Sequence, residues 1–380
     1  MTRRILIVPD KFKGSLSALE AAEAIARGWA AACPDDTLVL LPMSDGGDGF
    51  GPVMAGTLGL EEQFVEIVNA AGEARPAAWW FDFESCQAVV ETAQSNGLAL
   101  LPHRRFHPFD LDTCGVGQLL LAAGQLGAAH CLTGIGGSAT NDGGFGMARA
   151  LGWVFRDESG KAIEQWTRLD GLALIESPTN RAWPGVTVAS DVQNPLLGVD
   201  GATSVYGPQK GMRREDLAKG EACLDRLAKV TAETIGSDFS VTPGAGAAGG
   251  LGFGLMAFAG ATIESGFEVF AKATDLESKV GEADFVVTAE GAIDEQTLMG
   301  KGTGQVAAFC RRLGKPSIGL AGQLALEQDE VESAKHLFCR LAALVPDLAI
   351  ERDAMNNAAT YLEQLAKREG VLSRDTDFKD

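Results

Sequence analysis

Five segments of the chain combine small residues with a carboxylate, and each follows a short apolar run that predicts a buried strand. They are residues 9–15, 43–49, 134–144, 190–195 and 288–294. In an open α/β sheet, ligands bind beyond the carboxyl ends of the strands. The repetition of this pattern at five strand ends predicts that the segments meet at a ligand site and are not five unrelated turns.

The segment 134–144 gives the strongest of these signals because five of its eleven residues are glycine. Glycines let backbone N–H groups approach a ligand closely, and a predicted helix begins directly after the segment. Backbone N–H groups and a helix N-terminus together favour an anion such as phosphate. The residues predicted to bind it are Gly136, Gly137, Ser138, Thr140, Asn141 and Asp142. The alternative is a tight turn that ends in a helix N-cap.

Lysines in glycine-bearing loops supply the local positive charge that a nucleotide needs in so acidic a chain. Three of them stand in such loops, Lys13, Lys210 and Lys301. A glycine also adjoins three lysines in ordinary turn or helix-end positions, Lys161, Lys219 and Lys315. A neighbouring glycine alone therefore does not show that a lysine binds phosphate. Lys13 and Lys210 are favoured because hydroxyl or amide side chains share their loops.

Carboxylates at the strand ends suit two tasks of phosphoryl transfer to an alcohol, Mg²⁺ coordination and deprotonation of the hydroxyl. The candidates are Asp10, Asp45, Asp142, Asp191 and Asp294. Acids are also common in solvated turns, and this structural interpretation stays open for about half of them. No serine has a histidine placed to complete a hydrolytic triad.

Residues 244–249 match the pattern G-x-G-x-x-G of dinucleotide-binding proteins. That fingerprint requires a preceding strand, and Pro243 makes residues 240–243 a poor one. We interpret the segment as a glycine-rich entry to an apolar helix over 251–259, close to the site. The segment around Lys301 lacks the upstream glycine and the Ser/Thr of a P-loop.

The composition narrows the class of protein. The 380 residues include 51 Asp and Glu against 32 Lys and Arg, a formal net charge of −19 that disfavours nucleic acid and anionic membranes as partners. No apolar run approaches the roughly 20 residues of a membrane-spanning helix. The seven cysteines are scattered without C-x-x-C spacing and are predicted to be reduced thiols. The predicted location is the cytoplasm.

Hydrophobic periodicity predicts two kinds of architecture. Residues 4–8 and 37–41 read as buried strands that flank a helix over 19–33, with Ser17 and Glu20 as a capping box. The stretch from about 64 to 101 changes character: residues 64–68 alternate, 76–83 are rich in aromatic residues and 86–92 are apolar. This pattern predicts a mixed or antiparallel sheet. From residue 284 the pattern returns to α/β, with strands at 285–288 and 317–320, and helices at 304–313 and 354–368. The simplest assembly is one α/β domain built from residues 1–60 plus 256–380, into which residues 61–255 insert a second.

Seven segments, in this order, resemble the type I glycerate kinase family. They are 9–18 (PDKFKGSLSA), 43–49 (MSDGGDG), 134–144 (GIGGSATNDGG), 191–196 (DVQNPL), 206–211 (YGPQKG), 243–252 (PGAGAAGGLG) and 290–301 (EGAIDEQTLMGK). The resemblance implies a Rossmann-like parallel α/β domain interrupted by a second α/β domain with a mixed sheet. It also implies an active site in the cleft between them.

The resemblance implies that ATP phosphorylates D-glycerate with Mg²⁺, at the 2-hydroxyl to give 2-phosphoglycerate, or alternatively at the 3-hydroxyl. We assign catalysis to Asp191 and Asp45, with Asp191 also holding the metal. ATP is assigned to the 134–144 residues above, Lys210, Asp294 and Lys301. The acceptor is assigned to Asp10, Lys13, Ser15, Gly46 and Gly47. A monomer or homodimer is expected.

Two other functions compete with this one. A nicotinamide-dependent dehydrogenase of a small hydroxy acid would use the segment 244–249. A non-catalytic protein that binds small carboxylates would bind glycerate without forming ADP. The first predicts a change in NADH fluorescence on titration, and the second predicts glycerate binding that ATP does not affect.

Overall fold

The computed structural model describes residues 2–102 and 105–375. The chain divides into two compact units, unit 1 (residues 1–44 and 270–380) and unit 2 (residues 45–269). The sequence placed these boundaries at 60 and 256. Helix α2 (Phe50–Leu58) belongs to unit 2 because it packs on that unit's sheet, where a Cβ at Gly51 would lie 2.0 Å from the Trp80 ring. Strand β10 (Thr262–Glu264) also belongs there, since it pairs with strand β9 (Gly185–Ala189).

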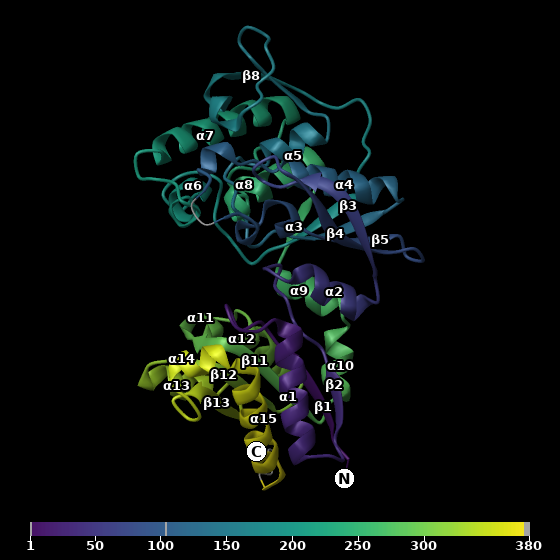
Figure 1. The fold of residues 1–380 in the computed structure, drawn as a ribbon, viewed down its shortest axis with the longest axis vertical. Coiled ribbons are helices and arrows are strands. Elements are labelled where there is room, and N and C mark those ends of the chain that lie inside the picture. The colour runs from purple at the N-terminus through teal and green to yellow at the C-terminus, as the bar shows by residue number, and fades with distance from the viewer. Residues whose placement is uncertain (1, 103–104, 376–380) are drawn as a thin grey trace. The chain divides into compact units, whose positions relative to one another are not determined.

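Unit 1 contains a parallel five-stranded sheet in the order β13-β12-β11-β1-β2 (Figure 1). The strands are β1 (Arg4–Pro9), β2 (Thr37–Leu40), β11 (Phe285–Asp294), β12 (Ser317–Ala325) and β13 (Arg340–Val345). The helices are α1 (Ala18–Ala32), α10 (Leu276–Glu282), α11 (Glu295–Leu298), α12 (Thr303–Arg312), α13 (Gln328–Ala334), α14 (Glu351–Asn356) and α15 (Ala358–Asp375). Helix α9 (Gly266–Ala273) spans the second boundary.

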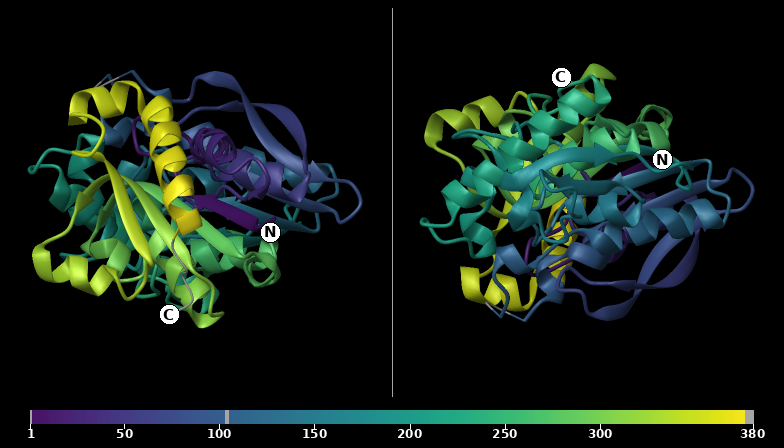
Figure 2. Two further views of the ribbon diagram at one scale, coloured as in Figure 1. Left: turned by 90° about the horizontal axis from the view of Figure 1, so that it is seen from below. Right: turned by 90° about the horizontal axis from the view of Figure 1, so that it is seen from above.

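Helix α1 begins as the sequence predicts. The Ser17 side chain accepts from the Glu20 N–H while the Glu20 carboxylate accepts from the Ser17 N–H, which completes the capping box. Its apolar face packs with α15 on alternate residues of the central strands, including Ile5 and Ile7 of β1. Figures 1 and 2 show α1 and α15 side by side on this sheet. Helices α10 and α12 also contact the sheet.

Three features of unit 1 differ from the prediction. Residues 289–294, expected as a turn, continue β11, because Ala292, Ile293 and Asp294 pair with the extended end of β12. Strand β13 was not predicted. The closing helix consists of two helices, α14 and α15, instead of one that begins at Ala354.

Unit 2 contains a mixed six-stranded sheet in the order β10-β9-β6-β5-β4-β3, so the mixed sheet is confirmed. Strands β3 (Glu61–Val68), β4 (Ala74–Asp82) and β5 (Gln87–Glu91) pair antiparallel, while β5, β6 (His130–Gly134), β9 and β10 pair parallel. Strands β7 (Val154–Asp157) and β8 (Leu172–Glu176) form a separate antiparallel pair. The hairpin of β3 and β4 forms one edge of the sheet (Figure 2).

The helices of unit 2 surround one large apolar core. They are α2, α3 (Ala93–Asn96), α4 (Cys114–Gln125), α5 (Phe145–Ala150), α6 (Ala202–Tyr206), α7 (Leu217–Ile235) and α8 (Ala247–Gly254), which a π-helical turn over Leu255–Ala259 continues. The seven cysteines are all free thiols, as predicted. Among the described residues, no helix combines the length and the apolar character needed to cross a membrane.

Candidate active site

Three of the predicted strand-end segments meet in unit 2. We call residues 134–144, between β6 and α5, the glycine loop. The Gly136 N–H donates to the Gly46 carbonyl at 3.0 Å, and a Cβ at Gly136 would lie 2.5 Å from Gly47 Cα. A Cβ at Gly46 would in turn lie 2.1 Å from the Ala189 carbonyl at the end of β9. Side chains at these glycines would force the three segments apart, so the glycines are required for the contact.

Lys210 comes from a different part of the chain, and its side chain is bonded to the glycine loop. Its buried Nζ donates to Ser138 Oγ at 2.9 Å and to the Thr140 carbonyl at 2.7 Å. Burial lowers its pKa to about 7, although the negative charge of Asp142 acts in the opposite direction. The amino group of Lys210 therefore ties together two residues of the loop through its hydrogen bonds.

Asp142 occupies the start of helix α5. Its carboxylate accepts hydrogen bonds from the Thr113 N–H and Oγ1 and from the N–H groups of Gly144 and Gly146, at 2.8–3.2 Å. Burial, and secondarily the charge of Asp112, raises its pKa to about 6. The sequence analysis expected this helix N-terminus to face a bound anion. In the structure the side chain of Asp142 accepts from the N–H groups of Gly144 and Gly146, so these two groups already have a partner.

The other short polar residues of the glycine loop bind neighbouring elements. Asn96 Nδ2 donates to Thr140 Oγ1 at 3.2 Å, and Asn141 Nδ2 donates to Thr203 Oγ1 at 3.0 Å. All four side chains are buried. These bonds make the loop a rigid part of unit 2.

The segment 244–250 supports the glycine loop from outside. The Gly143 N–H donates to the Gly249 carbonyl at 3.1 Å, and a Cβ at Gly249 would lie 2.0 Å from the Thr140 carbonyl. Residues 240–243 form turns, so no strand precedes the segment. The segment therefore lacks the preceding strand that the dinucleotide-binding fingerprint requires.

Asp45 and Asp191 both contact the turn that precedes α9. Asp191 Oδ1 accepts from Ser265 Oγ at 2.7 Å and from the Gly266 N–H at 3.0 Å. A Cβ at Gly266 would lie 1.9 Å from the Asp45 carbonyl, and Asp45 Oδ1 accepts from the Gly47 N–H at 3.1 Å. Sequence reasoning missed Ser265, whose only signal was the glycine beside it. Unit 2 therefore brings together two predicted carboxylates, the predicted acceptor glycines and the glycine loop.

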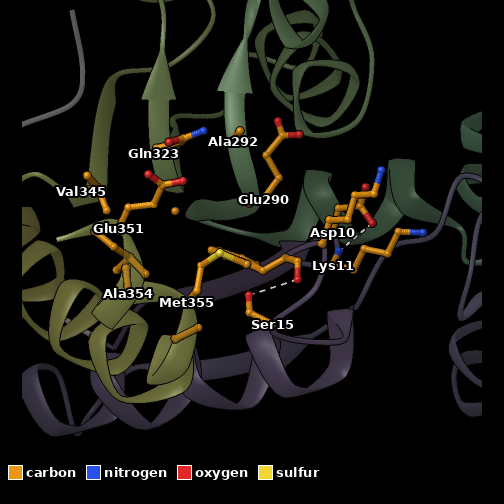
Figure 3. Close-up of a pocket in the computed structure, with 16 residues that line it drawn as sticks. Asp10, Lys11, Ser15, Glu290, Ala292, Gln323, Val345, Glu351, Ala354 and Met355 are labelled. Atoms are coloured by element: carbon orange, nitrogen blue, oxygen red, sulfur yellow. Dashed lines mark hydrogen bonds between the residues drawn. The ribbon is translucent and has the colours of Figure 1, made fainter. Parts of the chain in front are cut away.

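Unit 1 holds the remaining predicted residues. Asp10, Lys13 and Ser15 line a cavity of about 380 Å³ at the carboxyl ends of the parallel strands (Figure 3). Asp294 and Lys301 do not line it. Asp294 caps α11 by accepting from the N–H groups of Gln296 and Thr297, and Lys301 is exposed.

Glu290 is a cavity residue that the sequence analysis did not assign. Its Oε1 accepts from Thr297 Oγ1 at 2.9 Å and from Thr303 Oγ1. Burial raises its pKa to about 7, with smaller contributions from the charges of Asp10 and Asp294. Its place in the 288–294 segment was the signal that could have identified it.

No group of three or more His, Cys, Asp or Glu side chains among the described residues is arranged to hold a metal ion. A Mg²⁺ ion that accompanies phosphates needs only one or two protein carboxylates, because phosphate oxygens and waters complete its shell. Asp191 offers oxygen chemistry of that kind. The carboxylate of Asp191 therefore fits a Mg²⁺ ion that a nucleotide brings.

Both units carry their candidate residues beyond the carboxyl ends of parallel strands, as α/β enzymes that bind small ligands do. The model of the glycerate kinase family matches residues 5–372. A glycerate kinase of Halalkalibacterium halodurans is 39% identical over 375 residues, which cover 97% of this chain and 98% of that protein. The chain belongs to the glycerate kinase family.

Two further relatives agree with this membership. A protein of Escherichia coli named glycerate 2-kinase is 37% identical over 325 residues, or 84% of this chain and 85% of that protein. A crystal structure from Salmonella typhimurium LT2 that carries the name glycerate kinase 2 has a TM-score of 0.85 and 34% identity, with 99% of each chain covered. The predicted family, the α/β fold class and the enzyme class, a phosphotransferase with an alcohol acceptor, are confirmed.

Proposed function

We propose that this enzyme transfers the γ-phosphate of ATP to the 2-hydroxyl of D-glycerate, giving 2-phosphoglycerate and ADP. Membership of the glycerate kinase family supports the acceptor, and a kinase of this kind needs a nucleoside triphosphate as donor. The name of the Escherichia coli relative supports the 2-hydroxyl. Phosphorylation of the 3-hydroxyl is the alternative, and the product distinguishes them.

The observation that carries this proposal is the meeting of Asp191, Asp45 and the glycine loop within unit 2. Phosphoryl transfer passes through a loose transition state, so positioning and charge stabilisation supply most of the rate. We assign to Asp191 the proton of the acceptor hydroxyl or a place in the Mg²⁺ shell. Asp45 and the loop around Gly46 and Gly47 hold the acceptor, and the glycine loop faces the phosphates.

Mg²⁺ supplies neutralisation of the phosphate charge when it is bound with the nucleotide. Asp191 is the residue that would hold it, since its carboxylate is oriented by two hydrogen bonds to one oxygen. We further propose that the enzyme works in the cytoplasm as a monomer or homodimer, which light scattering of the purified chain would establish.

The test is product analysis. Purified enzyme, Mg·ATP and D-glycerate should form ADP in a coupled assay, while omission of Mg²⁺ or replacement of D-glycerate by L-glycerate should abolish the signal. In phosphorus NMR, a phosphate on the secondary carbon couples to one proton and gives a doublet, whereas a 3-phosphate gives a triplet. A triplet would contradict the 2-hydroxyl assignment, and ADP formation that does not depend on glycerate would contradict the acceptor.

A further inference from the structure

The cavity of unit 1 lies where the connections of its sheet diverge. Strand β1 leads through α1 to β2 on one side, and its neighbour β11 leads through α12 to β12 on the other. Open α/β sheets bind ligands at such a switch point, outside the carboxyl ends of the strands. Residues that directly follow β1, such as Phe12, and residues 290–292 of β11 line the cavity. Its position is therefore that of a binding site.

The size of the cavity does not match the acceptor. Its volume of about 380 Å³ falls within the range of roughly 300–1,000 Å³ that organic ligands of drug size occupy. A three-carbon acid would leave most of it empty. Gly291 and Gly322 line the cavity without side chains. A Cβ at Gly322 would lie 2.4 Å from the Gly291 carbonyl, so this glycine is required where β11 and β12 meet. A ligand larger than a three-carbon acid fits this space.

The lining combines an apolar wall with a few polar groups. Leu344, Ala354, Met355 and Ala358 come from β13, α14 and α15. Figure 3 shows Glu290 on β11 and Gln323 on β12, with Met355 on the opposite side of the cavity. Apolar walls combined with placed polar groups are usual for sites that bind small molecules and cofactors. The base and ribose of a nucleoside match this combination.

The charges of the lining also disfavour an anionic acceptor. The charged residues of the lining are three carboxylates, Asp10, Glu290 and Glu351, and two lysines, Lys11 and Lys13. A carboxylate ligand among three acids would meet like charge, whereas ionised carboxylates accept hydrogen bonds from neutral hydroxyl and amino groups. A ribose offers such hydroxyls, and adenine offers an exocyclic amine.

We propose that the unit 1 cavity binds the nucleoside part, adenine and ribose, of the phosphate donor. This inference rests on the proposed function for the identity of the donor. It reassigns Asp10, Lys13 and Ser15 from the acceptor to the nucleotide. The apolar wall around Met355 contacts the base, and the carboxylates accept from the ribose hydroxyls and the amine.

The experiment titrates adenosine and ADP, in the absence of glycerate, into wild-type enzyme and Met355→Trp. Met355 is 51% exposed, so the larger side chain can enter the cavity without disturbing the core. The matched control is Val371→Trp, which places the same side chain on α15 at a residue that is 49% exposed and does not line the cavity. Thermal melting of both variants verifies that they are folded.

We expect Met355→Trp to weaken adenosine and ADP binding about tenfold or more, and Val371→Trp to leave both within about twofold of wild type. Glu351→Gln, an exposed and isosteric change, should weaken adenosine by a few-fold. The KM for D-glycerate should stay near the wild-type value in all three variants. Adenosine distinguishes nucleoside contacts from phosphate contacts.

Two results would overturn the inference. One is a raised KM for D-glycerate in Met355→Trp with unchanged ADP affinity, which would return the cavity to the acceptor. The other is no binding of adenosine or ADP by the wild type, or binding that Met355→Trp does not change. The proposed function is judged separately, because wild-type enzyme that binds adenosine in this cavity and yet forms no ADP with D-glycerate would contradict only that function.

Discussion

The glycine loop of unit 2 and the cavity of unit 1 both lie at the carboxyl ends of parallel strands, yet their polar groups have different surroundings. At the glycine loop, the polar groups of Lys210 and Asp142 are buried. Lys210 bonds to Ser138 and Thr140 of the loop, and Asp142 bonds to Thr113. In the cavity, Glu290 and Glu351 line an open space. The comparison indicates that the buried polar groups of unit 2 keep the glycine loop rigid. In unit 1 the polar groups line a cavity that can hold a ligand.

Removal of charge at Asp191 should have the largest effect on catalysis. Asp191→Asn keeps an oxygen that can accept from Ser265 Oγ and the Gly266 N–H, so the turn stays in place. Loss of the carboxylate should lower kcat by about 10²–10⁴-fold, the usual range for a general base. Steady-state kinetics and a melting temperature measure both quantities. Turnover within a few-fold of wild type would show that Asp191 is not the catalytic carboxylate.

Lys210→Met tests whether the buried amino group of Lys210 organises the glycine loop. Without it, Ser138 Oγ and the Thr140 carbonyl lose their donor, which should cost about 1–3 kcal/mol of unfolding free energy. The folded-state pKa of Lys210 is lowered from 10.5 to about 7, so between these pH values the unfolded chain binds more protons than the folded chain. The contribution of Lys210 to stability is therefore complete above pH 10.5 and is lost as the pH falls through about 7. Urea unfolding at pH 7 and pH 9 should therefore show a rise in stability that the variant lacks. An equal rise in both proteins would contradict this placement.

Asp142→Asn tests the internal cap of α5. The amide oxygen of Asn can accept some of these hydrogen bonds, but its NH₂ group would point at N–H donors such as those of Gly144 and Gly146. We therefore expect the free energy of unfolding to fall by about 1–3 kcal/mol. Because burial raises the folded-state pKa from 3.8 to about 6, the contribution of this carboxyl is complete below pH 3.8 and is lost as the pH rises through about 6. Denaturant titrations at pH 4.5 and pH 6.5 should show a decline in the wild type that is smaller in the variant. A steeper decline in the variant would be contrary evidence.

Glu290→Gln should have the smallest effect. The amide oxygen can still accept from Thr297 and Thr303, so the fold is retained. With a wild-type pKa of about 7, Glu290 changes charge near neutrality, and the affinity for ADP should vary by a few-fold between pH 6 and pH 8. In the variant this dependence should be reduced. An identical pH profile would separate Glu290 from nucleotide binding.

The sequence predicted much of the fold because local signals agreed with long-range packing. The capping box of Ser17 and Glu20 and the alternation in residues 64–68 are local signals, and both the cap and the strand appear in the structure. The strand conformation of residues 289–294 is not local. Glu, Gly and Asp have low strand propensity, and these residues are extended because β12 pairs with them.

The candidate site was predictable by residue type but not by environment. Glycines marked the close contacts at Gly46 and Gly136 correctly, since only a residue without a side chain permits them. The sequence could not reveal that the Asp142 carboxylate occupies the helix N-terminus, or that Lys210 is buried within the loop. Both features depend on partners distant in the chain, such as Thr113, which only the folded chain brings near.

The central claim is that the nucleoside and the chemistry belong to different regions of the molecule. Adenosine titration of Asp191→Asn and Met355→Trp tests it most directly, because adenosine carries neither phosphate nor metal. We predict that Asp191→Asn binds adenosine within about twofold of wild type, while Met355→Trp binds it about tenfold more weakly or not at all. Weak adenosine binding in Asp191→Asn together with wild-type affinity in Met355→Trp would contradict the account.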